Sequence, residues 1–287
     1  MSNVFTGQVQ GISKIATGTP AAFCRAISGG DFAIDPNNTI FNGIGGQVVA
    51  RKGANAITLS FTCGGVDKAD LALWFPVTAV VQVATFPDFL IEVDDGTNGQ
   101  EWVLTGGQPS SAKVSCAGGL GSEVQYTLGM SFKLATEQAV GTKVPVYNSL
   151  IGHTNNNIGV TYGGAAAGTL SFDLSNDLGA EFHNPMDAKT AGVQHVVDGV
   201  YITKNDVKFS AVLSNVLKGT AMDVDTWTPE AVVIAMLNGT AGQNITATLS
   251  NMVPGAWGMP VEAQGRIGFK HEWIPGPGTA FNRVVFT

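Results

Sequence analysis

The residues of this chain that are best suited to metal binding do not have the spacing of a metal site. Metal ligands in proteins come as clusters of His, Cys or carboxylate side chains, often in patterns such as H-E-x-x-H or C-x-x-C. Neither pattern occurs here, and the four histidines are far apart: His153, His183, His195 and His271. Three cysteines, Cys24, Cys63 and Cys116, form no C-x-x-C pair. We expect no metal and interpret the cysteines as buried or half-buried thiols, with a bridge as the alternative.

Other chemical motifs are absent or incomplete. Asp94-Asp95-Gly96 lacks the ligand order and the closing Glu of a calcium loop and favours a tight hairpin. Gly118-Gly119-Leu120-Gly121 is followed by Ser122, not by the lysine of a phosphate-binding loop, and no G-x-S-x-G nucleophile elbow is present. The sequence therefore predicts a protein that is not an enzyme and needs no cofactor, with a dispersed hydrolase site as the remaining enzymatic alternative.

Tryptophans could serve sugar binding, because an indole ring stacks on a sugar face. The five are Trp74, Trp102, Trp227, Trp257 and Trp273. Trp74 lies on the apolar side of an expected helix and Trp102 in an expected strand, so core or subunit contacts are favoured. A carbohydrate-binding β-sandwich of a phage fibre or an adhesin is the alternative function.

Short strands are the elements that must position these residues. The 37 glycines and the scarcity of helical periods are typical of sandwiches and barrels. In 57–62 the apolar residues Ile57, Leu59 and Phe61 alternate with hydroxyl residues, which predicts one core face and one polar face. Further strands are expected over 77–85, 89–93, 101–105, 112–116, 124–134 and 207–212.

Two short helices are expected. In 66–76, Asp67 can cap a helix that Pro76 ends, and in 228–239 a Thr-Pro start precedes an Asn-Gly stop. Each follows a strand, and 124–133 aligns with 261–270 at a separation of 137 positions. This order suggests a weak internal duplication.

Composition favours association with other protein. Charged residues make up only 13% of the chain, so one ordinary defence against association is reduced. The formal net charge is −7 and no Lys/Arg run occurs, which argues against tight nucleic-acid binding. No apolar stretch is long enough for a spanning helix, and no secretory signal is visible, so we expect synthesis in a cytoplasm and no membrane partner.

The strand-helix-strand units of 57–76 with 124–135, and of 207–213 with 228–239 and 261–273, resemble those of bacteriophage major tail tube proteins. The resemblance implies a mainly β chain with two tandem β-sandwich or barrel domains of tail-tube type, 1–143 and 144–287, each with one short flanking α-helix. It implies a structural virion subunit that self-assembles into stacked rings.

The resemblance also implies partners. These are other copies of the chain, in trimeric pseudo-hexameric or hexameric rings, and other tail proteins such as a terminator, a baseplate or a sheath. Double-stranded DNA would pass through the lumen during ejection without specific binding. The expected lumen positions are Gln125, Thr127, Glu262 and Gln264. An N-terminal arm that embraces a neighbour is expected at Gln10, Ile12, Ile15 and Thr17.

Overall fold

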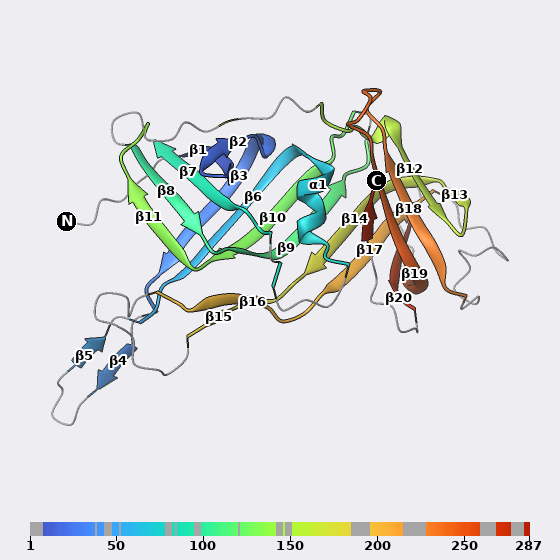
Figure 1. The fold of residues 1–287 in the computed structure, drawn as a ribbon. Helices are drawn as coiled ribbons and strands as arrows, with labels where there is room; N and C mark the ends of the chain where they lie inside the picture. Colours follow the sequence, from blue (N-terminus) through green and yellow to red (C-terminus); the bar gives the residue numbers. More distant parts are fainter. Residues whose placement is uncertain are drawn as a thin grey trace, which may run out of the picture.

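The computed structural model describes residues 8–37, 39–42, 48–51, 53–77, 82–83, 85–94, 99–119, 121–141, 146, 151–184, 196–214, 228–258, 268–276 and 284–287. It is mainly β, as predicted, with large antiparallel sheets (Figure 1). The expected boundary at 143/144 lies outside the described residues.

The described residues of the first part of the chain form eleven strands and one helical segment. The strands are β1 (Gln8–Ala16), β2 (Thr19–Ala21), β3 (Cys24–Asp35), β4 (Thr39–Asn42), β5 (Val48–Arg51), β6 (Ala56–Val66), β7 (Asp88–Asp94), β8 (Gly99–Thr105), β9 (Gln108–Cys116), β10 (Gln125–Phe132) and β11 (Leu134–Gln138). The helical segment comprises α1 (Lys68–Leu71) and a 3-10 turn, η1 (Ala72–Trp74).

The later part is almost entirely strand where it is described. After a 3-10 turn, η2 (Asn155–Asn157), come β12 (Ile158–Tyr162), β13 (Ala165–Ala167), β14 (Thr169–Asp177), β15 (Ala180–His183), β16 (Gly199–Ile202), β17 (Asp206–Leu213), β18 (Glu230–Met236), β19 (Ile245–Gly258), β20 (Phe269–Pro275) and β21 (Val284–Phe286).

One scheme of strand pairing occurs twice along the chain. In the first part, β3-β6-β10-β9 pair in that order in one sheet and β11-β8-β7-β1-β2 in another. In the later part, the orders are β14-β17-β20-β19 and β21-β19-β18-β12-β13. A separate hairpin, β4-β5 or β15-β16, falls between the first two strands of each four-stranded order. We call β1–β11 the first repeat and β12–β21 the second repeat.

Strand irregularities recur at matching places. An extra residue lies in β3 against β6, between Ile27 and Gly29, and in β14 against β17, between Thr169 and Ser171. An extra residue also lies in β9 against β10 and in β19 against β20. The β6-β10 and β17-β20 pairs have none. Because bulges are specific features of a fold, this agreement supports true equivalence of the repeats.

A kink in one strand of each repeat has the same backbone conformation. In the first repeat β8 and β9 belong to different sheets, and Gly106 between them has φ 64°. In the second repeat the single long strand β19 pairs with β18 over its first part and with β20 over its last part, and Asn251 within it has φ 58°. Gly and Asn are the residues that tolerate this left-handed region best.

Pairing registers correct the expected alignment of the repeats. Cys63 pairs with Tyr126 next to the β3 bulge, and Leu213 pairs with Phe269 next to the β14 bulge. Tyr126 therefore corresponds to Phe269, 143 positions later, not 137 as the sequence alignment had it. The sequence alignment missed this because loops of different length separate the strands, and only pairing fixes their register.

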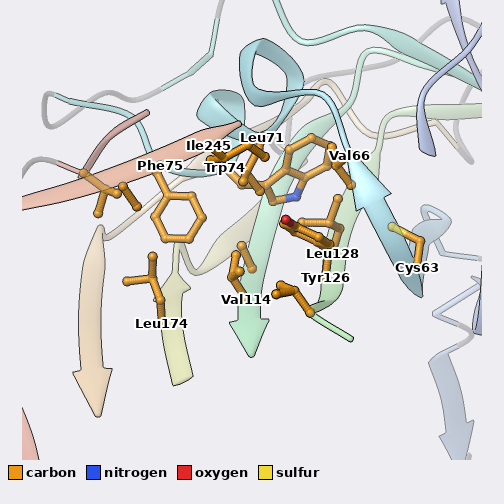
Figure 2. Packing of buried hydrophobic residues seen from close by; sticks show 14 of the residues in the cluster. Cys63, Val66, Leu71, Trp74, Phe75, Val114, Tyr126, Leu128, Leu174 and Ile245 are labelled. Carbon is orange, nitrogen blue, oxygen red and sulfur yellow. The ribbon is translucent and has the colours of Figure 1, made fainter. Parts of the chain in front are cut away.

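The first predicted helix is confirmed. Asp67 accepts a hydrogen bond from the Ala69 backbone N–H (2.8 Å) and so caps α1. Trp74, at the end of the helical segment, is fully buried, and its Nε1–H donates to the Gly129 carbonyl (2.8 Å). The side chain therefore fixes the helical segment across β10 (Figure 2).

The second predicted helix is wrong. Residues 230–236 form strand β18, in which Val232, Ile234 and Met236 are buried and the residues between them are half-buried. The Thr-Pro start and Asn-Gly stop are present, but adjacent β-branched residues prefer strand, and pairing with β12 and β19 on both sides decides the conformation.

A single apolar core runs through both repeats. Figure 2 shows Val114, Tyr126 and Leu128 of the first repeat in the same cluster as Leu174 and Ile245 of the second. The three cysteines are free and buried, which confirms their interpretation as buried thiols. No helix in the described part of the chain is long and apolar enough to span a membrane.

Candidate assembly site

The two repeats are joined edge to edge by β9 and β14. These strands pair antiparallel from Ser111↔Asp177 to Cys116↔Phe172, so one sheet continues from the first repeat into the second (Figure 1). The joint is head to tail, because the last strand of one four-stranded order meets the first strand of the next. Such a contact uses two different surfaces and can be repeated by further copies.

The core face of this internal joint is well packed, and its other face carries an ion pair. On the core face, Val114 and Leu174 are directly opposite each other and fully buried. Asn176 is also buried, and its Nδ2 donates to the Trp74 carbonyl (2.8 Å), which ties the helical segment to the second repeat. On the other face, Lys113 Nζ and Asp173 Oδ1 form an ion pair at 2.9 Å. This internal joint is an example of how one repeat binds another.

Two strand edges remain unpaired at the ends of the same four-stranded orders. Among the described residues, β3 pairs only with β6, so its outer edge is open. In β19, pairing with β18 ends at Met252, so the outer edge of 253–258 has no partner in the part of the chain that is described. Unpaired edges are templates for pairing with another chain.

Large apolar side chains are exposed on both open edges. Ile34 on β3 is 41% exposed and Trp257 on β19 is 54% exposed. Ile34 lies opposite the buried Ile57, and Trp257 lies opposite the buried His271, so both point to the core side of the sheet. The apolar core is therefore left incomplete at these two edges.

The opposite face of the four-stranded orders is polar. The expected lumen residues Gln125 and Thr127 both lie there on β10, and the Thr127 hydroxyl lies 2.9 Å from that of Thr62. Glu262 and Gln264 lie outside the described residues. Sequence analysis correctly separated the two faces of this sheet, while a lumen role for these residues stays a prediction.

Acidic groups outnumber basic groups on this polar face. The described acidic residues there are Asp31, Asp35, Asp173, Asp177, Asp206 and Glu272, and the basic ones are Lys113, Lys208 and Lys270. The formal charge of the described face is therefore −3. A hollow of about 480 Å³ on this face is lined by Lys113, Asp173, Ser175 and Lys208 among others.

The expected arm residues lie in a paired strand of this chain. Gln10, Ile12 and Ile15 belong to β1, which pairs with β7 and, at its end, with β2; Thr17 begins the turn to β2 with φ 48°. Ile12 is fully buried in the chain's own core. An intermolecular contact of these positions stays a prediction, and the Ile12 side chain has no surface free for it.

The candidate chemical groups are not brought together. His153 is buried, with Nδ1 3.3 Å from the Tyr126 hydroxyl and Nε2 3.0 Å from the Gln243 carbonyl, and burial lowers its pKa. Burial also lowers the pKa of His271, whereas His183 is exposed and His195 lies outside the described residues. No group of metal-ligating side chains is found in the described part of the chain.

The tryptophans do not form a sugar-binding platform within the described residues. Trp74 and Trp273 are buried, and Trp102 packs against Phe32 with ring centroids 5.4 Å apart. Trp257 is the exposed one, and Trp227 lies outside the described residues. The tryptophans described here therefore serve packing, with Trp257 at an open edge.

Sequence reasoning missed the open edges themselves. Pro109 and Pro254 occupy the same register position, opposite Met130 and Trp273, but only the strand pairing reveals this equivalence. Comparison with known proteins adds no further guide, because no protein-family model matches the chain and no curated protein is significantly similar to it.

Proposed function

We propose that this chain is a structural subunit of a phage tail tube, made of two tandem tail-tube-like domains over 1–143 and 144–287. The observation that carries the proposal is the internal β9-β14 joint together with the two open edges. One head-to-tail contact is already made within the chain. The two strand edges that could make the next contact, on β3 and on the last part of β19, are open. Heterologous contacts of this kind close into a ring when the rotation between repeats allows it.

The polar face of the four-stranded orders suits the inside of such a ring. Its described part is rich in hydroxyl and charged side chains, and acids outnumber lysines. Double-stranded DNA would be repelled by this wall and would pass along it without specific binding. The chain acts as a virion component without catalysis, with other copies and other tail proteins as its partners.

Three chains per ring is the arrangement we favour. Each chain contributes two repeats of the same topology, so three chains give six repeats around the axis with pseudo-sixfold symmetry. Six chains, with one repeat of each outside the ring, is the other arrangement. The internal joint favours the first, because it places both repeats in one continuous sheet.

Electron microscopy of the purified chain at increasing concentration tests the proposal. We expect rings, or tubes of stacked rings, and class averages along the axis will give the number of chains. A species that remains a single chain at the highest concentration, by imaging and by light scattering, would contradict it. Glycan binding by that single-chain species would favour the carbohydrate-binding alternative instead.

A further inference from the structure

The internal joint predicts the register of the joint between chains, residue by residue. The two open edges correspond to the two strands that already pair: β3 to β14, and the last part of β19 to β9. Each pair of strands shares its place in the order and its bulge. If equivalent strands pair in an equivalent way, the β9-β14 register can be transferred to β19 and β3 of the next chain.

The correspondence of β3 with β14 is fixed by the turn after each strand. Asp35 Oδ1 accepts a hydrogen bond from the Asn37 backbone N–H (2.9 Å), and Asp177 Oδ1 accepts one from Gly179 (3.0 Å). Asn37 has φ 45° and Gly179 has φ 53°. Both strands therefore end in the same aspartate turn, 142 positions apart.

The correspondence of β9 with β19 is fixed by the prolines. Pro109 lies opposite Met130, and Pro254 lies opposite Trp273, in both cases on the far side of the bulge. The two prolines are 145 positions apart. Ala112 and Trp257 are also 145 positions apart and lie opposite Leu128 and His271. The same offset therefore holds on both sides of the bulge.

Transfer of the register brings the two exposed apolar residues together. In the internal joint Ala112 lies opposite Asn176, and both are buried. Their counterparts are Trp257 and Ile34, which are exposed on the core side of the two open edges. The two neighbouring pairs become Gly258 opposite Ala33 and Ala256 opposite Asp35.

We infer that β19 of one chain pairs antiparallel with β3 of a second copy, with Trp257 directly opposite Ile34. This inference rests on the proposed assembly function and adds its contact surface and register. The pairing buries both side chains and completes the core at each edge. One difference from the internal joint is expected: Leu178 N–H donates to the Ser110 carbonyl there (3.0 Å), whereas Pro36, the counterpart of Leu178, has no N–H to donate.

Paired cysteines on the polar face test the register. Gly258→Cys with Ala33→Cys places thiols directly opposite each other, where Cα atoms are about 4.5–5.5 Å apart and a disulfide can form. A Cβ at Gly258 meets open space, and Ala33 is exposed, so neither change disturbs the chain. The matched control, Gly258→Cys with Asp35→Cys, shifts one thiol by two residues to about 7–8 Å.

The expected result is efficient cross-linking between chains of the Gly258/Ala33 variant upon mild oxidation, with little in the control or in either single variant. In a closed ring of three chains, the covalent ladder on a non-reducing gel stops at three. Rings that form under reducing conditions but do not cross-link, or cross-link equally in the control, would overturn the register while leaving the assembly proposal intact. Failure of the unmodified chain to assemble would overturn both.

Charge at the apolar pair gives an independent test. Trp257→Asp and Ile34→Asp should each raise the protein concentration required for ring formation at least tenfold, because each would bury a carboxylate at the joint. The matched control is Leu237→Asp, at a residue that is 47% exposed but lies away from both open edges. Equal loss in the control, or normal rings in the two edge variants, would count against the Trp257-Ile34 pair.

Discussion

Lys14 and Asp70 join β1 to α1 by a largely buried ion pair. Lys14 Nζ lies 2.7 and 2.6 Å from the two carboxylate oxygens, and Asp70 is 8% exposed. Burial raises the pKa of Asp70, and Lys14 offsets part of that effect. Each of the two charges is therefore stabilised in its buried position by the other.

Removal of only one partner should be costly. Lys14→Met leaves the Asp70 charge buried without compensation, and we expect a loss of about 3 kcal/mol in the free energy of unfolding. Lys14→Met with Asp70→Leu should recover most of it. Urea denaturation measures both, and Lys208→Ala, at an exposed ion pair, should change stability by less than about 0.5 kcal/mol. An equal loss in the single and double variants would show that packing alone is responsible.

Two buried histidines make stability depend on pH. Burial lowers the pKa of His153 and His271 below the unfolded value of about 6.5, so the unfolded chain binds more protons as pH falls. Their contribution is fully present above that pH and is lost below it. We expect a lower urea midpoint at pH 5.5 than at 7.5 and a smaller difference in His271→Phe. The exposed His183→Gln is the control, and an unchanged pH dependence in His271→Phe would contradict this role.

At the scale of elements, Gly106 and Asn251 have left-handed φ values at the place where the chain changes its strand partners in each repeat. Gly106→Ala should cost about 1 kcal/mol, because alanine is strained at positive φ and its Cβ would lie 3.0 Å from Lys133 Cβ. Asn251→Gly should leave stability unchanged within about 0.5 kcal/mol, because glycine is unstrained there. Thermal denaturation of the two variants checks this. A loss in Asn251→Gly larger than that in Gly106→Ala would mean that the hydrogen bond from Asn251 Nδ2 to the Gly276 carbonyl matters more than backbone strain.

Local signals predicted some elements and failed for others. The alternation around Leu59 predicted a strand with two distinct faces, and Asp67 predicted the start of the helix, because both depend on nearby residues alone. Around Val232 the end signals favoured helix, and the neighbouring strands imposed sheet. The open edges at Trp257 and Ile34 could not be predicted, because an edge is defined by which distant strand does not pair with it.

For the whole molecule, the charge of the polar face should control how DNA interacts with assembled tubes. Gln125→Lys with Thr127→Lys adds two positive charges to that face on every chain. We expect these tubes to retain double-stranded DNA at low salt and to release it as salt rises, whereas unmodified tubes do not bind it. Electrophoretic mobility of DNA with each kind of tube measures the effect.

The control for this experiment places a single added positive charge elsewhere. Thr136→Lys lies on the exposed strand β11, in the other sheet of the first repeat. Tubes of this variant should behave like unmodified tubes if the polar face of the four-stranded orders lines the channel. Retention of DNA by Thr136→Lys but not by the β10 variant would contradict a lumen lined by the polar face of the four-stranded orders.

The β9-β14 joint also has a kinetic meaning. Because both strands belong to one polypeptide, this contact forms during folding at a rate that does not depend on protein concentration. Only the contacts between chains require diffusional encounter, so three chains would form a circle of six repeats in two encounters, whereas six separate repeats would need five. Covalent linkage also frees the two kinds of seam to diverge in sequence, as the Ala112-Asn176 pair and the proposed Trp257-Ile34 pair differ.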